Sequence, residues 1–198
     1  MTEAGTPRAE IVSETTLSDE WTRLSRYELD YTDRAGETHR LRREIYHRTE
    51  AACILLYDPK RDAVVLVRQF RLPVRLCGGD GWLIEVPAGL LDGEQPEEAI
   101  RREAMEETGY RVTAVRRLFK AFTSPGAVTE YVHFFAATVD SADRVAAGGG
   151  VDHEHEDIEV LDVPLADAMR MIETGEICDA KTIMLLQWAA LNRESLRA

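Results

Sequence analysis

The sequence predicts an α+β fold in which helices cover a mixed β-sheet. β-prone segments fill most of residues 21–86, a strongly helical segment follows at residues 96–108, and more strands then precede two helical segments. This order is typical of sandwiches of helices and mixed strands. The length of 198 residues suffices for about one compact domain with an appended element.

The first elements expected are those of an N-terminal hairpin. Residues 1–19 are expected to be a tail or an edge segment. Residues 21–31 and 38–48 are β-prone and flank a turn signal at residues 33–36. Two such runs around a turn predict an antiparallel pair.

The remaining strands are more apolar and are expected to form the main sheet. Turn signals at residues 58–62 and 124–126 join four of these strands into two hairpins. Residues 71–81 and the glycine-rich residues 146–150 are expected to be loops. The strands are predicted at residues 52–57, 63–70, 82–86, 112–122, 131–139 and 158–163.

Three helices are expected. Pro96 suits the first turn of the clearest helix, and Gly109 suits its C-terminal cap. Residues 164–174 predict a second helix. Asp179 can cap a last helix that runs to about Asn192.

Composition excludes several classes of function. The net charge of −12 argues against non-specific nucleic-acid binding, which needs a basic surface. The apolar runs are shorter than a membrane span, and the N-terminus resembles no signal or transit peptide. Three scattered cysteines, Cys53, Cys77 and Cys178, are expected to be free thiols of a cytoplasmic protein.

The charge is distributed in alternating blocks. Residues 76–110 and 140–162 are acidic, each with a net charge of −7. Residues 34–75 and 111–139 are basic. Such blocks are either solvated surfaces or a divalent-metal site beside an anion site.

The predicted helix at residues 96–108 carries three carboxylates on one side. Glu103, Glu106 and Glu107 stand at i, i+3 and i+4 spacing. Like charges at these spacings destabilise a helix unless a cation neutralises them or water screens them. Carboxylate oxygens suit Mg²⁺ or Mn²⁺, although a surface helix with Arg–Glu pairs fits the same composition.

Residues 89–110 read GLLDGEQPEEAIRREAMEETGY, a segment that resembles the Nudix box. The resemblance implies an α/β/α sandwich around a mixed sheet and metal-assisted hydrolysis of a nucleoside diphosphate linked to another moiety. It implies that Glu103 and Glu107 are the main metal ligands, with Glu106 assisting. The backbone carbonyl of Ala88 would be a further ligand.

The box departs from the family pattern at one place. Four residues rather than five separate Gly89 from Glu94. Since Glu94 keeps its spacing to Arg102, we expect a loop that is one residue short and an unaffected helix.

Other segments resemble the nucleoside-diphosphate-sugar pyrophosphatase branch of the Nudix hydrolases. Residues 148–159 and 175–182 resemble its GDP-mannose hydrolase members, which are relatives of the ADP-ribose pyrophosphatases. The loop carboxylate of this branch, a metal ligand or general base, matches Glu156. Because the loop is longer here, Glu154 is a rival for that role.

The resemblance also implies substrate contacts and an assembly. Residues 1–48 would be an N-terminal segment used in homodimer formation and substrate contact, and residues 49–198 would be the Nudix hydrolase domain. The implied substrate-binding residues are Trp21, Arg43, Glu44, Arg71, Glu130 and Lys181.

The predicted function is Mg²⁺-dependent hydrolysis of a nucleotide sugar, with Mn²⁺ as a substitute cation. GDP-mannose would give GMP and mannose 1-phosphate. The alternative is ADP-ribose pyrophosphatase activity, which gives AMP and ribose 5-phosphate. A more remote alternative is a non-catalytic nucleotide-sugar sensor.

Overall fold

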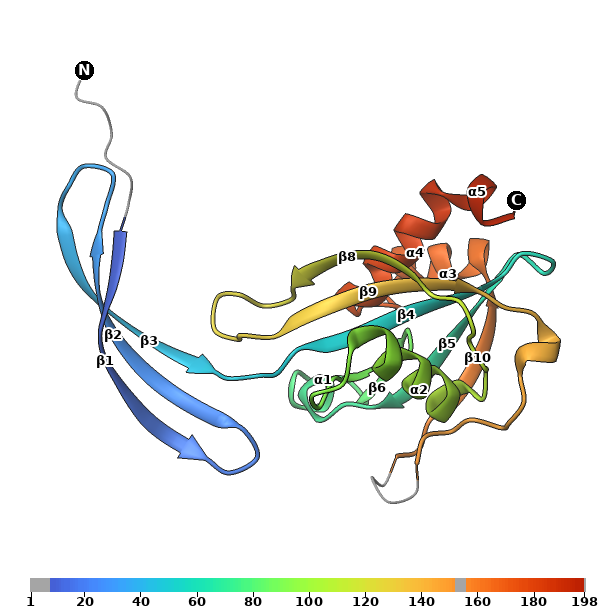
Figure 1. The fold of residues 1–198 in the computed structure, drawn as a ribbon, viewed down its shortest axis with the longest axis horizontal. Coiled ribbons are helices and arrows are strands. Elements are labelled where there is room, and N and C mark those ends of the chain that lie inside the picture. Colours follow the sequence, from blue (N-terminus) through green and yellow to red (C-terminus); the bar gives the residue numbers. More distant parts are fainter. Residues whose placement is uncertain (1–7, 152–155, 198) are drawn as a thin grey trace. The chain divides into compact units, whose positions relative to one another are not determined.

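The computed structural model describes residues 8–151 and 156–197 (Figure 1). The chain forms two compact units. Unit 1 comprises Met1–Thr49 and Phe122–Tyr131, and unit 2 comprises Glu50–Ala121 and Val132–Ala198. Within the described part of the chain, no helix is both long and apolar enough to cross a membrane.

Unit 1 is built on a three-stranded antiparallel sheet. Its strands are β1 (Arg8–Asp19), β2 (Arg23–Thr32) and β3 (Thr38–Tyr46), in the order β1-β2-β3. The predicted hairpin is confirmed, and the expected edge segment is the edge strand β1. At the turn, Asp33 Oδ1 accepts hydrogen bonds from the backbone N–H groups of Ala35 and Glu37.

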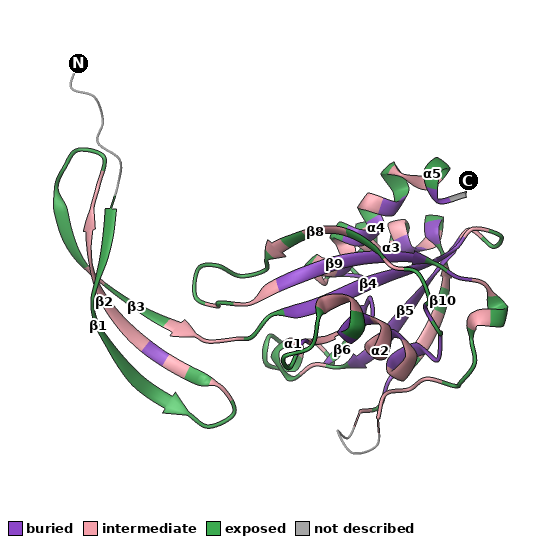
Figure 2. Ribbon diagram, viewed as in Figure 1, coloured by how far each residue is buried: buried purple, intermediate pink, exposed green. Residues whose placement is uncertain are grey.

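This sheet has almost no core of its own. Every residue of β1 is exposed, and among the described residues of the three strands only Ser25 is buried (Figure 2). The side chain of Ile11 is 71% exposed. Small sheets normally need an apolar face packed on another layer to be stable.

Unit 2 contains a mixed sheet, as predicted. The strand order is β10-β5-β4-β9-β8, with β6 paired to β5 and β7 paired to β4. β4 and β9 are parallel, whereas β4 is antiparallel to β5. The strands are β4 (Ala51–Asp58), β5 (Ala63–Phe70), β6 (Trp82–Glu85), β7 (Ala88–Leu90), β8 (Arg116–Phe122), β9 (Tyr131–Thr138) and β10 (Glu159–Pro164).

Helices cover both faces of this sheet. Alternate residues of β4 point to opposite faces, so Leu55 packs in one apolar cluster and Ile54 in the other. One cluster includes residues of α3 and α4, and the other includes residues of α2. This arrangement confirms the α/β/α sandwich and explains why β4 is buried throughout (Figure 2). The helices are α1 (Leu72–Leu76), α2 (Pro96–Thr108), α3 (Leu165–Thr174), α4 (Ala180–Leu191) and α5 (Arg193–Arg197), with a 3₁₀ turn at Ser141–Asp143.

The structure corrects two local predictions and adds two short elements. The expected loop at residues 71–81 contains α1, which Pro73 helps to start because proline suits a first helical turn. The strand predicted at residues 112–122 begins only at Arg116, and Val112 instead packs in the apolar cluster beneath α2. β7 and α5 were not predicted, because elements of three and five residues show no periodic pattern.

Candidate metal and diphosphate site

Helix α2 is fixed at both ends and along one face. Pro96 lies in its first turn, and Gly109 ends it in the left-handed conformation with φ of 76°. Its buried residues Ile100 and Ala104 pack on the sheet.

Two carboxylates of α2 lie beside strand β7, one buried and one partly buried. The Glu107 side chain is 2% exposed, and its Oε2 accepts a hydrogen bond from the backbone N–H of Ala88 at 3.1 Å. Burial raises the pKa of Glu107 well above its ordinary value, and the charge of Glu103 adds to this shift. Burial is also the main cause that raises the pKa of Glu103 to about 7. Both groups are therefore costly to ionise without a cation.

A close backbone approach makes room for Glu103. A Cβ atom at Gly89 would lie 2.0 Å from Oε1 of Glu103, so a side chain at this position of β7 would displace the Glu103 carboxylate. The structure thus brings Gly89, Ala88, Glu103 and Glu107 together, as the Nudix resemblance implies.

The glycine-rich loop adds a fourth carboxylate. The N–H groups of Gly149 and Gly150 donate to the last carbonyls of α2, those of Glu107 at 2.9 Å and Glu106 at 3.0 Å. Glu156 Oε2 accepts a hydrogen bond from Val151 N at 3.1 Å. The Glu156 charge helps to raise the pKa of both Glu103 and Glu107. Its rival Glu154 lies outside the described residues.

One arginine partly balances these charges. Arg102 lies 3.0 Å from Glu103, 2.8 Å from Glu106 and 3.2 Å from Glu94. The contact with Glu94 shows that the short loop still places this carboxylate against Arg102. A single guanidinium cannot neutralise four glutamates, and their oxygens are hard ligands. The donor set therefore fits a divalent cation such as Mg²⁺.

A second group of potential ligands lies in unit 1. Ligand atoms of Asp33, Glu37 and His39 come within 4.8 Å of one another. Asp33 caps the β2–β3 turn, and its other oxygen lies 3.0 Å from His39 Nε2. The structure of the turn explains this group without a metal.

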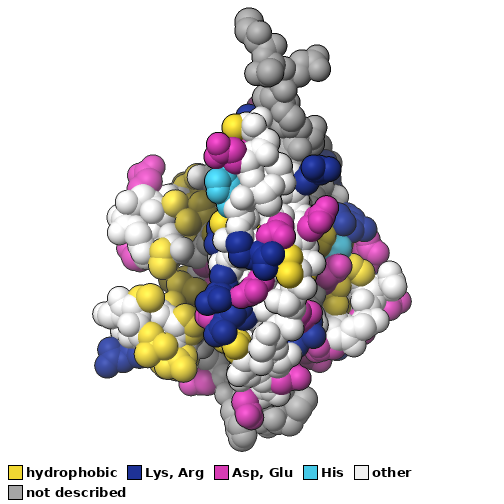
Figure 3. All heavy atoms as spheres, turned by 90° about the vertical axis from the view of Figure 1, so that its left-hand side faces the viewer, with side chains coloured by type: hydrophobic (Ala, Val, Ile, Leu, Met, Phe, Trp, Pro, Cys, Tyr) yellow, Lys and Arg dark blue, Asp and Glu magenta, His cyan; other side chains and the backbone are white. Residues whose placement is uncertain are grey.

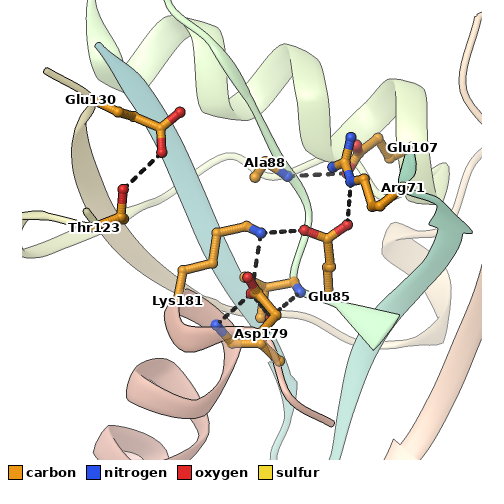
Figure 4. A network of polar contacts seen from close by, with 10 residues as sticks. Arg71, Glu85, Ala88, Glu107, Thr123, Glu130, Asp179 and Lys181 are labelled. Atoms are coloured by element: carbon orange, nitrogen blue, oxygen red, sulfur yellow. Dashed lines mark hydrogen bonds and ion pairs between the residues drawn. The ribbon is translucent and has the colours of Figure 1, made fainter. Parts of the chain in front are cut away.

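Two predicted substrate residues of unit 2 converge on one buried acid. Arg71 and Lys181 both contact Glu85, which is 2% exposed (Figure 4). Lys181 also lies 3.1 Å from Asp179. Glu85 was not among the predicted site residues, since no local pattern links residues that are so far apart along the chain.

Trp21 and Glu130, two of the predicted substrate-binding residues, lie at the end of unit 1 that carries its loop 122–131. The Trp21 side chain is 80% exposed, and the Arg48 guanidinium lies 4.8 Å from the centre of its ring. Glu130 accepts a hydrogen bond from Thr123 Oγ1 at 2.8 Å and pairs with Arg48 at 3.7 Å. Trp21 is therefore not a core residue of this chain.

The other two lie on strand β3. Arg43 is exposed and donates to the backbone carbonyl of Arg42, and Glu44 pairs with Arg26 at 3.6 Å. Figure 3 shows basic and acidic side chains interspersed over one face of the molecule.

Other polar residues of unit 2 have structural partners. His133 is buried, with Nε2 at 2.5 Å from Glu50 and Nδ1 at 3.0 Å from Arg117. Arg68 and Trp82 line an open pocket of about 330 Å³. The three cysteines are free, and burial raises the pKa of the Cys53 thiol.

Two family models match the chain. The model of the NUDIX domain matches residues 47–186. The model described as the GDP-mannose pyrophosphatase NudK N-terminal domain matches residues 8–46.

Similar proteins cover nearly the whole chain. A GDP-mannose pyrophosphatase of Escherichia coli O1:K1 / APEC is 48% identical over 188 residues, which are 94% of this chain and 97% of the relative. One of Shigella flexneri serotype 5b (strain 8401) is 47% identical over the same shares. A crystal structure of an ADP compounds hydrolase has a TM-score of 0.74 and 20% identity, covering 96% of this chain and 97% of that chain. At this identity the structural match shows the fold.

Proposed function

We propose that this chain, which belongs to the Nudix family of hydrolases, hydrolyses the diphosphate bond of GDP-mannose. The products are GMP and mannose 1-phosphate. The observation that carries the proposal is the buried Glu107 at Ala88 with the partly buried Glu103 beside it, in a chain 48% identical to a GDP-mannose pyrophosphatase.

We assign the metal ligands from the same geometry. Glu103, Glu107, Glu156 and the carbonyl of Ala88 hold Mg²⁺, or Mn²⁺ in its place, and Glu106 assists them. When bound, the cation neutralises the diphosphate and activates water. Glu156 completes the ligand set or accepts the proton of the attacking water.

The substrate contacts include two cations of unit 2. Arg71 and Lys181 are the cations of unit 2 that we assign to the phosphates, since both contact Glu85 and Arg71 lies next to Glu107 (Figure 4). Trp21, Arg43, Glu44 and Glu130 stay predictions from the resemblance.

The choice of nucleotide sugar is tested by a substrate screen. We expect GDP-mannose to be hydrolysed at least about tenfold faster than ADP-ribose, a difference of about 1.4 kcal/mol in the barrier. Released monophosphate is measured for each nucleotide sugar with Mg²⁺ and with Mn²⁺. Faster hydrolysis of ADP-ribose would favour the alternative activity. Tight binding without product would favour a sensor.

We further propose a homodimer in which a second copy covers the sheet of unit 1. This sheet buries one residue among its described strands and exposes Ile11, so it has no core that would stabilise it in isolation.

Free thiols support the predicted cytoplasmic location.

The mass in solution tests the dimer. We expect twice the chain mass of 22.3 kDa, and Ile11→Asp should shift the protein toward the monomer because it places a charge on the covered strand. Leu191→Asp is the matched control, since Leu191 of α4 is 86% exposed. A wild-type protein that is monomeric at every concentration would contradict the proposal.

A further inference from the structure

Glu85 joins two cations from distant segments of unit 2. It lies at the end of β6, two residues before the Pro87-Ala88 step that leads to the metal site. Its Oε2 accepts a hydrogen bond from Arg71 Nε at 2.6 Å, and its Oε1 accepts one from Lys181 Nζ (Figure 4). A single carboxylate therefore fixes both predicted phosphate contacts.

The start of helix α4 holds the same group in place. Asp179 caps α4 by accepting hydrogen bonds from Thr182, and it also lies 3.1 Å from Lys181 Nζ. Val86, the residue after Glu85, donates its N–H to Thr182 Oγ1 at 2.8 Å. The cations Arg71 and Lys181 are thereby balanced by two carboxylates. Loss of Glu85 would leave Arg71, whose side chain is 40% exposed, without its carboxylate partner, whereas Lys181 would keep Asp179.

The pairing leaves one side of Arg71 available. Glu85 engages Nε, and among residues 8–151 and 156–197 no acceptor contacts Nη1 or Nη2. Figure 4 shows Arg71 next to Glu107 of the carboxylate group. The two terminal nitrogens of a guanidinium form a fork that matches phosphate oxygens. Since a guanidinium is planar, the bond at Nε fixes the plane of that fork.

We propose that Glu85 is a positioning residue that orients Arg71 and Lys181 toward the diphosphate of the substrate. This inference rests on the proposed function, because it takes the diphosphate as the group that the two cations bind. Glu85 itself is anionic and acts on the substrate only through its two partners.

The test compares Glu85→Gln with the wild type in two assays. Titration calorimetry with inorganic pyrophosphate and Mg²⁺ should show binding weakened by about tenfold or more, the range expected when a charge-assisted hydrogen bond is lost. The KM for GDP-mannose should rise similarly, while kcat changes by less than about threefold. The variant loses the orientation of the bound diphosphate but keeps the proposed metal ligands Glu103, Glu107 and Glu156. Asp58→Asn is the matched control, since Asp58 is also a buried acid, 5% exposed. It lies at the end of β4 away from the residues that pair with β7.

Further variants separate positioning from folding. Glu85→Asp keeps the charge but is one methylene shorter, so it should also weaken pyrophosphate binding. It provides the test if Glu85→Gln does not fold. In an Arg71→Gln background, Glu85→Gln should cost less than it does alone, because Glu85 acts through Arg71. Equal pyrophosphate affinity in the wild type and folded Glu85 variants, or no pyrophosphate binding at all, would overturn the inference. Pyrophosphate binding without turnover of any nucleotide sugar would contradict the proposed function instead.

Discussion

Replacing Glu107 by glutamine should lower kcat for GDP-mannose by about 10³-fold or more, which corresponds to about 4 kcal/mol of barrier. The substitution keeps the size of the side chain and an oxygen for the N–H of Ala88, which now lies 3.1 Å from Oε2. It removes the negative charge that a divalent cation needs. The measurement is a steady-state assay of GMP release.

The same variant should fold at least as well as the wild type when no metal is bound. Burial raises the pKa of Glu107 well above its ordinary value. A carboxyl whose pKa is higher in the folded state destabilises the fold above its unfolded pKa, and this cost is relieved as the pH falls through the raised value. At pH 8 with a chelator, the Tm of Glu107→Gln should therefore equal or exceed that of the wild type.

An exposed carboxylate of the same helix provides the control. Glu98 lies in the first turn of α2 and is exposed, so Glu98→Gln should change neither activity nor metal-free Tm. Wild-type turnover in folded Glu107→Gln would show that Glu107 is not a metal ligand.

The helix of the site was predictable because its signals are local. Pro96 and Gly109 mark its ends, and the spacing of Glu103 and Glu107 places both on one side whatever the helix packs against. The mixed sheet was predictable for a similar reason, since β4 and β5 are apolar and join at a clear turn.

The surroundings of these glutamates were not predictable from local patterns. Contacts of Glu85 connect residues that are 14 and 96 positions apart. The close approach of the backbone at Gly89 to the Glu103 carboxylate is set only by tertiary packing. The sequence also gives no signal for the loop bonds that bring Glu156 to the end of α2.

Removal of divalent metal should have the second large effect. The site contains Glu103, Glu106, Glu107 and Glu156, with Arg102 as the cation that contacts two of them. Without a divalent cation, this group repels an anionic diphosphate and offers no Lewis acid. A chelator should therefore lower the hydrolysis of GDP-mannose by about 10³-fold or more, and added Mg²⁺ should restore it.

Product identification with and without Mg²⁺ tests the central claim most directly. GDP-mannose is incubated with the purified protein in Mg²⁺ or in chelator, and the products are resolved by phosphorus NMR. We predict GMP and mannose 1-phosphate in equal amounts with Mg²⁺, and no turnover with the chelator. Hydrolysis that persists in the chelator, or release of GDP and mannose, would contradict metal-dependent cleavage of the diphosphate bond.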